Sequence, residues 1–98
     1  MKIENLRLFL EVAESGSINK TAEQNFLTHQ SLGVILKSLE KELNCTLFIR
    51  TNKGVALSAE GKEFLPYARQ AVGAIDEYMT LHPTAITDIL QLYTTPVL

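Results

Sequence analysis

The chain has 98 residues, 46% hydrophobic and 20% charged, a composition typical of one folded soluble domain rather than a disordered protein. Its formal net charge is −2, whereas nucleic-acid-binding domains are usually basic; however, residues 1–62 carry eight basic and seven acidic side chains (net +1), and residues 63–98 carry one and four (net −3). No apolar run approaches the ~20 residues of a membrane span, charged residues interrupt the N-terminal segment so that it lacks the apolar core of a signal peptide, and the lone Cys45 cannot form an internal disulfide. We therefore expect a cytoplasmic protein with no membrane partner.

Two helices are predicted at the start of the chain. Residues 3–14 place apolar side chains at helical spacing, and Gly16 is expected to end this helix because glycine adopts the left-handed backbone without a Cβ penalty. Ser17 is a suitable N-cap for a short second helix over residues 18–25.

A third helix follows after a turn of about three residues, the connection typical of a helix-turn-helix. Thr28 is its predicted N-cap and Asn44 its left-handed end. Its apolar stripe repeats at helical spacing through Leu32, Leu36, Leu39 and Leu43.

The pattern then changes from helical to alternating. Residues 47–50 and 55–57 predict two strands joined by a tight turn that ends at Gly54. Ser58 is the predicted N-cap of a long fourth helix over residues 59–80.

This order of elements predicts a mainly α fold with a small β-hairpin, namely a winged helix-turn-helix followed by a long helix. We divide the chain into a winged helix-turn-helix at 1–58, a linker or dimerisation helix at 59–82 and a tail at 83–98, within which residues 89–94 suit a strand.

Five segments, in order and at matching spacing, resemble the N-terminal DNA-binding domain and linker helix of LysR-type transcriptional regulators. They are LRLFLEVAESGS (6–17), TAE (21–23), LEKEL with LFIRT (39–51), GVALSAEG (54–61) and LPYAR (65–69). The resemblance implies a sequence-specific, DNA-binding transcriptional regulator in which Glu40 has a structural partner.

The recognition helix departs from the family's usual Ser-Gln-Pro-Ala start, because this chain has THQSLGVI at 28–35. Gly33 replaces a hydroxyl donor and weakens a helix by about 1 kcal/mol relative to alanine. Val34 stands where a polar or basic residue is common. The scaffold is therefore kept while the face that would read DNA is unusual.

Recognition helices read base edges through side chains near their N-terminus, so the predicted contacts here are Thr28, His29, Gln30, Ser31 and Lys37. The Gln30 amide suits adenine, and the helix N-terminus suits a phosphate. The alternative is that Thr28 is only a helix cap and Ser31 only a solvated side chain.

The predicted wing adds Arg50, Asn52 and Lys53, which suit the phosphate backbone or the minor groove. Exposed lysines are also ordinary at hairpin tips, so these residues could simply keep the tip soluble. Arg50 could instead pair with a carboxylate and brace the domain.

The fourth helix carries an apolar seam at alternating spacings of three and four, formed by Leu65, Ala68, Val72, Ile75 and Met79. This seam either packs on its own domain or pairs with a second helix, and a helix that extends beyond a small domain favours the second role. The family resemblance implies an antiparallel homodimer, with higher oligomers open, that reads a roughly palindromic site in double-stranded DNA.

No catalytic motif, metal-ligand spacing or cofactor motif is present, so we expect neither an enzyme nor a metal or cofactor site. The tail resembles the first strand of the family's effector-binding domain, and a small-molecule effector is expected only if the native chain continues. The sequence leaves open a fragment or a naturally short regulator. It also leaves open a second function, an interaction module with a degenerate DNA-reading face that pairs with a full-length regulator.

Overall fold

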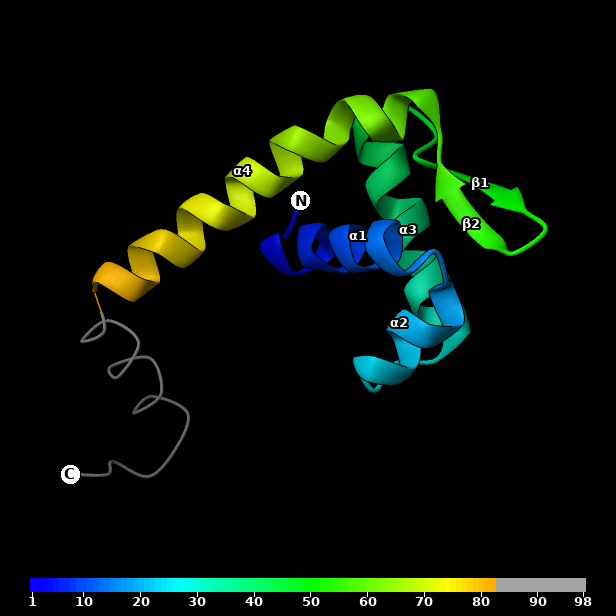
Figure 1. Ribbon diagram of the computed structural model, residues 1–98, viewed down its shortest axis with the longest axis horizontal. Coiled ribbons are helices and arrows are strands. Elements are labelled where there is room, and N and C mark those ends of the chain that lie inside the picture. The colour runs from blue at the N-terminus through cyan, green and yellow to red at the C-terminus, as the bar shows by residue number, and fades with distance from the viewer. Residues whose placement is uncertain (83–98) are drawn as a thin grey trace.

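The computed structural model describes residues 1–82, which form four helices and one hairpin in the predicted order (Figure 1). The elements are α1 (Ile3–Ser15), α2 (Ile18–Gln24), α3 (His29–Leu43), β1 (Phe48–Thr51), β2 (Gly54–Leu57) and α4 (Ala59–Leu81). The predicted fold class, a mainly helical winged helix-turn-helix, is confirmed. The strand predicted at 89–94 lies outside the described residues. No helix within residues 1–82 is long and apolar enough to cross a membrane.

The predicted helix ends are confirmed by their capping contacts. The side-chain oxygens of Ser17, Thr28 and Ser58 each accept a hydrogen bond from the backbone N–H three residues later. Gly16 and Asn44 adopt left-handed backbone conformations, with φ of 70° and 55°, where α1 and α3 end. Short-range chemistry therefore sets these boundaries.

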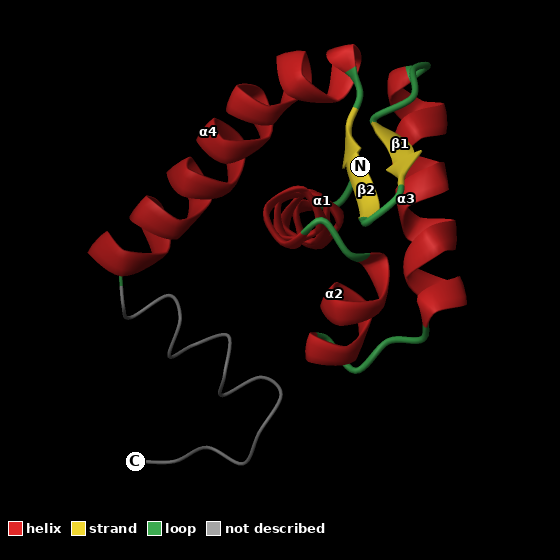
Figure 2. Ribbon diagram, turned by 45° about the vertical axis from the view of Figure 1, so that its right-hand side comes forward, coloured by secondary structure: helices red, strands yellow, loops and turns green. Residues whose placement is uncertain are grey.

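Helix α1 lies at the centre of the molecule and contributes to both apolar clusters. In Figure 2 it is seen end-on, between α4 on one side and the α2–α3 pair on the other. One cluster joins it to α4 and consists of Leu6, Phe9, Leu39, Leu47, Ala68 and Val72. The other joins it to the helix-turn-helix and consists of Leu8, Val12, Ala22, Leu32 and Leu36.

The hairpin is fixed to the turn between α1 and α2. Its strands are antiparallel, with Phe48 opposite Leu57. The Val55 N–H donates to the Gly16 carbonyl oxygen at 3.0 Å. Gly54 has φ of 141°, and a Cβ built on it would lie only 2.3 Å from that same oxygen. The wing can approach this turn so closely only because position 54 is glycine.

Helix α4 crosses α1 and continues past the three-helix body (Figure 1). Ala68 and Val72, two members of the apolar seam predicted on this helix, are buried against α1. This corrects the expectation that the seam pairs with a second helix rather than packing on its own domain. Further along, the Arg7 guanidinium donates to both carboxylate oxygens of Asp76, and this hydrogen bonding holds the pKa of Asp76 below its usual value. The part of α4 that extends as far as Asp76 therefore belongs to the folded body.

Candidate nucleic-acid interface

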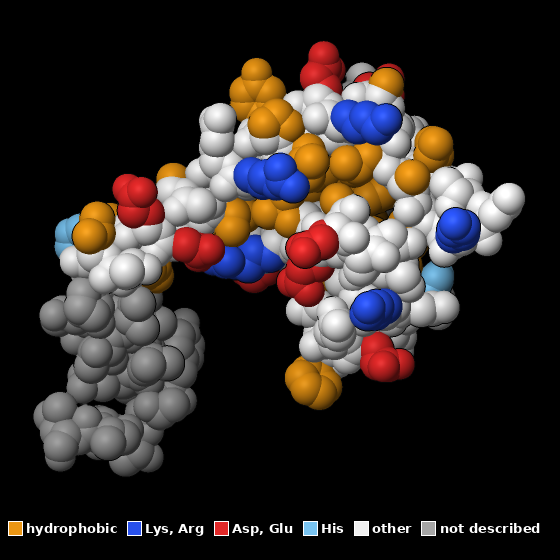
Figure 3. Space-filling view, viewed as in Figure 1, with side chains coloured by type: hydrophobic (Ala, Val, Ile, Leu, Met, Phe, Trp, Pro, Cys, Tyr) orange, Lys and Arg blue, Asp and Glu red, His pale blue; other side chains and the backbone are white. Residues whose placement is uncertain are grey.

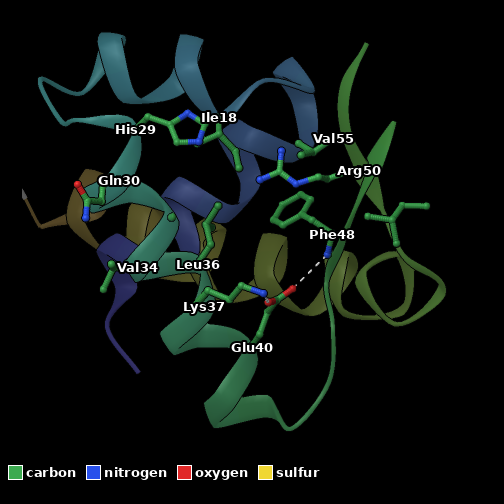
Figure 4. Close-up of a pocket in the computed structure, with 12 residues that line it drawn as sticks. Ile18, His29, Gln30, Val34, Leu36, Lys37, Glu40, Phe48, Arg50 and Val55 are labelled. Carbon is green, nitrogen blue, oxygen red and sulfur yellow. Dashed lines mark hydrogen bonds and ion pairs between the residues drawn. The ribbon is translucent and has the colours of Figure 1, made fainter. Parts of the chain in front are cut away.

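Helix α3 turns one face inward and the opposite face to solvent. Leu32, Leu36 and Leu39 are buried, as their spacing predicted. Residues on the outer side form what we call the reading face, made of Gln30, Gly33, Val34 and Lys37. Figure 4 shows Gln30 and Val34 on the side of α3 that points away from the body.

The N-terminus of α3 is held by its own hydroxyl groups. The Thr28 Oγ1 accepts from the Ser31 N–H at 3.0 Å, and its hydroxyl donates to the Ser31 Oγ at 2.9 Å. Both residues are exposed. The structure thus shows the capping role of Thr28, and the cap leaves both side chains at the surface from which α3 would meet a ligand.

His29 connects α3 to α2 through a hydrogen bond between its Nδ1 and the Asn19 Oδ1. An amide oxygen only accepts, so the His29 Nδ1 is the donor in this contact. The ring is therefore oriented by α2, a contact that the sequence did not indicate.

A groove of about 430 Å³ separates the reading face from the wing. Arg50 extends from β1 across this groove toward His29 (Figure 4), and among residues 1–82 no carboxylate lies within ion-pair distance of its guanidinium. The ion pair considered as an alternative for Arg50 is therefore not formed within the described residues. Asn52 and Lys53 lie exposed at the wing tip, beyond the groove.

Glu40 closes the inner end of the same groove. Its Oε2 accepts from the backbone N–H groups of Leu47 and Phe48 at 2.7 and 3.3 Å, and its Oε1 lies 3.8 Å from the Lys37 Nζ. Glu40 thus holds the chain that enters the wing against α3. The resemblance implied a structural partner for Glu40, but the sequence did not show that this partner is backbone.

Charged side chains are spread over the molecule rather than gathered. Figure 3 shows Lys and Arg side chains separated by Asp and Glu on the face drawn, with hydrophobic side chains between α4 and the body. No group of three or more His, Cys, Asp or Glu residues within the part of the chain described could hold a metal ion. The basic side chains that line the groove are Lys37 and Arg50, and Lys53 lies at the wing tip.

Residues 3–62 match the family model of bacterial regulatory helix-turn-helix proteins of the lysR family. The chain belongs to the LysR family. It is 34% identical, over its whole length, to the HTH-type transcriptional regulator CitR of Bacillus subtilis, and 35% identical over 79% of its length to the HTH-type transcriptional regulator SoxR of an Arthrobacter strain. The chain spans 35% and 27% of the length of these two relatives.

Solved structures of LysR-type DNA-binding domains share the fold. The DNA-binding domain of BenM in a complex with benA site 1 DNA superposes with a TM-score of 0.78 at 27% identity, covering 88% of this chain and 97% of that one. The CbnR DNA-binding domain–DNA complex gives a TM-score of 0.77 at 26% identity, covering 88% and 99%. As a LysR-family domain, the chain thus has the architecture that these two proteins show with DNA.

The outer face of α4 carries a second apolar seam that was not predicted from the sequence. Its larger members are 44–68% exposed, and the seam consists of Tyr67, Ala71, Ala74, Ile75, Tyr78 and Leu81. Apart from Ile75, its members repeat at spacings of four and three, so a search for both heptad registers would have found it. Of the predicted seam, Leu65 and Met79 are half-buried, Ala68 and Val72 are buried, and Ile75 is exposed.

Proposed function

We propose that this chain is the DNA-binding part of a LysR-type transcriptional regulator and binds double-stranded DNA through α3 and the wing. The observation that carries the proposal is the exposed reading face of α3 beside Arg50 of the wing, which forms no ion pair within residues 1–82. An α-helix of this kind enters the major groove, and the wing lies along the adjacent backbone or minor groove.

Each side chain has a separate task in this proposal. The Gln30 amide reads an adenine edge, and Lys37 contributes a cation one to two turns further along α3. Thr28, His29 and Ser31 contact base edges or a phosphate at the helix N-terminus, where the helix dipole favours negative charge. On the wing, Arg50, Asn52 and Lys53 hold the sugar–phosphate backbone.

We further propose that two chains pair through their α4 helices. Ala68 and Val72 pack on α1 of their own chain, so they are not available to a second chain. The pairing surface in this proposal is therefore the outer seam of α4, which includes Ile75. An exposed apolar seam at heptad spacing is the surface through which helices associate. A two-fold axis between antiparallel helices would give a dimer that reads a roughly palindromic site. The proposal places this chain in the cytoplasm and leaves higher oligomers open, and it includes a small-molecule effector only if the native chain continues into an effector-binding domain.

The test is binding of the purified chain to duplexes selected from a random pool, measured by fluorescence anisotropy over a range of salt concentrations. We expect the Lys53→Gln variant to reduce the slope of log K against log[salt] by about 1, because one phosphate contact is lost. Gln30→Ala should weaken selected duplexes more than random ones. Lys2→Gln, which removes an exposed charge at the far end of α1, is the matched control. Failure to bind any duplex at low salt would refute the proposal.

A second function is favoured by the net charge of −2 and by the two positions of the reading face, Gly33 and Val34, that carry no polar side chain. In this case the chain pairs with a full-length regulator through α4 and does not bind DNA itself. The same variants separate the two functions, since regulation would then survive replacement of Gln30 and Lys53 with alanine.

A further inference from the structure

We propose that Gly33 and Val34 form a methyl-reading patch that selects a thymine in the major groove. This inference rests on the proposed function, because it names the base that the reading face recognises. It concerns the two positions at which the reading face carries no polar group.

Packing within the chain does not account for Val34. Its side chain is 64% exposed, whereas Leu32 and Leu36 on the same helix are 0% and 4% exposed. Valine is also a weaker helix former than the straight-chain residues usual on a helix surface. A β-branched side chain has essentially one rotamer in a helix, so Val34 presents a rigid apolar surface to solvent.

Packing does not account for Gly33 either. Among residues 1–82, a Cβ built at this position would meet no atom within 4 Å apart from the adjoining backbone of α3, so no neighbouring element requires a glycine there. Glycine in a helix interior is unfavourable relative to alanine, and its only local consequence is an uncovered stretch of backbone beside Val34. Another molecule can therefore approach Val34 more closely than a larger residue at position 33 would allow.

The chemistry of the major groove provides a matching partner. Thymine presents an apolar group there, its C5-methyl, and side-chain methyl groups contact it. Val34 lies one helical turn after Gln30, whose amide suits adenine, the base that pairs with thymine (Figure 4). Gln30 and Val34 together would therefore read A·T pairs, one by hydrogen bonds and the other by contact with a methyl group.

The experiment replaces single thymines with deoxyuridine in a selected duplex, which removes the methyl group and keeps the base pairing. For the native chain we expect one position in each half-site at which uracil weakens binding about fourfold, the effect of one buried methyl group. In Val34→Ala this loss should fall below twofold at that position. Ser38→Ala, on an exposed part of α3 that does not line the groove, is the control and should keep the full uracil effect.

Gly33→Ala provides an independent readout. Alanine should raise the melting temperature, because it favours the helix and meets no neighbour, and should weaken binding to the selected duplex at the same time. If uracil affects the native chain and Val34→Ala equally, or affects neither, the methyl-reading role is wrong although DNA binding stands. If no duplex binds at low salt, the proposed function itself fails.

Discussion

Replacing Gly54 with alanine should destabilise the domain by weakening the attachment of the wing. Gly54 begins β2 with φ of 141°, a conformation that residues with a Cβ rarely adopt. The added methyl group would lie 2.3 Å from the Gly16 carbonyl oxygen. The oxygen is a backbone atom and the backbone of residue 54 fixes the position of the methyl group, so the overlap cannot be relieved by turning a side chain.

Two costs contribute to the magnitude. Holding a non-glycine residue in this region costs about 1–3 kcal/mol. The contact is about 1 Å shorter than the roughly 3.3 Å at which carbon and oxygen ordinarily meet, so the wing must move away from the turn. That movement breaks the Val55–Gly16 hydrogen bond, worth about 1 kcal/mol. We therefore expect a loss of about 2–4 kcal/mol, and a melting temperature lower by about 8 °C or more.

The assay is urea unfolding followed by far-UV circular dichroism, at one protein concentration because association stabilises the folded state. Gly73→Ala is the matched control. It lies in the interior of α4, and within the described part of the chain the added Cβ meets no atom within 4 Å apart from the adjoining helix backbone, so the substitution should stabilise the domain by about 1 kcal/mol. Gly16→Ala should fall between the two, since its φ is 70° but its Cβ would make an ordinary 3.5 Å contact. A Gly54→Ala variant within about 0.5 kcal/mol of the native chain would refute the reasoning.

Substitutions at three further positions test other features of the fold. Arg7→Gln should raise the pKa of Asp76 toward its usual value, as measured by NMR titration of the carboxyl group. Because the Asp76 pKa is lowered in the native fold, the stabilisation that the Arg7–Asp76 pair gives to that fold is fully present above the pKa of Asp76 in the unfolded chain. It is lost as the pH falls through the lowered value. An unchanged Asp76 pKa would contradict this. Glu40→Ala should lower the free energy of unfolding, measured with urea, by about 2 kcal/mol. Glu40→Gln should lower it less, because the amide oxygen still accepts a hydrogen bond. Equal losses in the two variants would argue against the contacts between Glu40 and the backbone N–H groups. Phe26→Asn should raise the free energy of unfolding by up to about 1 kcal/mol, because Phe26 has a left-handed backbone with φ of 58° and is 96% exposed. A lower melting temperature would show that the ring is needed.

The helix boundaries were predictable because their causes are local. Ser17, Thr28 and Ser58 cap helices through hydrogen bonds to residues three positions away, and such contacts can be inferred from the sequence alone. Gly16 and Asn44 end helices because of their own backbone preferences. None of these features depends on where the rest of the chain lies.

The face of α4 that packs against α1 was predicted only in part, because it depends on tertiary packing. Its sequence holds two apolar seams, and periodicity does not tell which one faces α1. The seam through Ala68 and Val72 packs inward, while that through Tyr67 and Tyr78 faces solvent. The position of α1 decides between them, and no local pattern contains that information.

The candidate interface likewise has features that could be predicted from the sequence and features that depend on tertiary packing. The position of Gln30 on the outside of α3 follows from the buried stripe of leucines, so helical spacing was sufficient to find it. The open space around Gly33 and the contact between His29 and Asn19 depend on neighbouring elements. They could be found only once α2, α3 and the wing were placed together.

The attachment of α4 to α1 has a mechanical consequence for a dimer joined through α4. A helix of 23 residues is about 35 Å long, so a tilt of about 10° at its base displaces its far end by about 6 Å. The rise between base pairs is about 3.4 Å, so such a tilt changes the separation of two recognition helices by more than one base pair. Ala68, Val72 and the Arg7–Asp76 pair fix this angle. Substitutions there would alter which spacing of half-sites the dimer fits, while every side chain that meets the DNA stays the same.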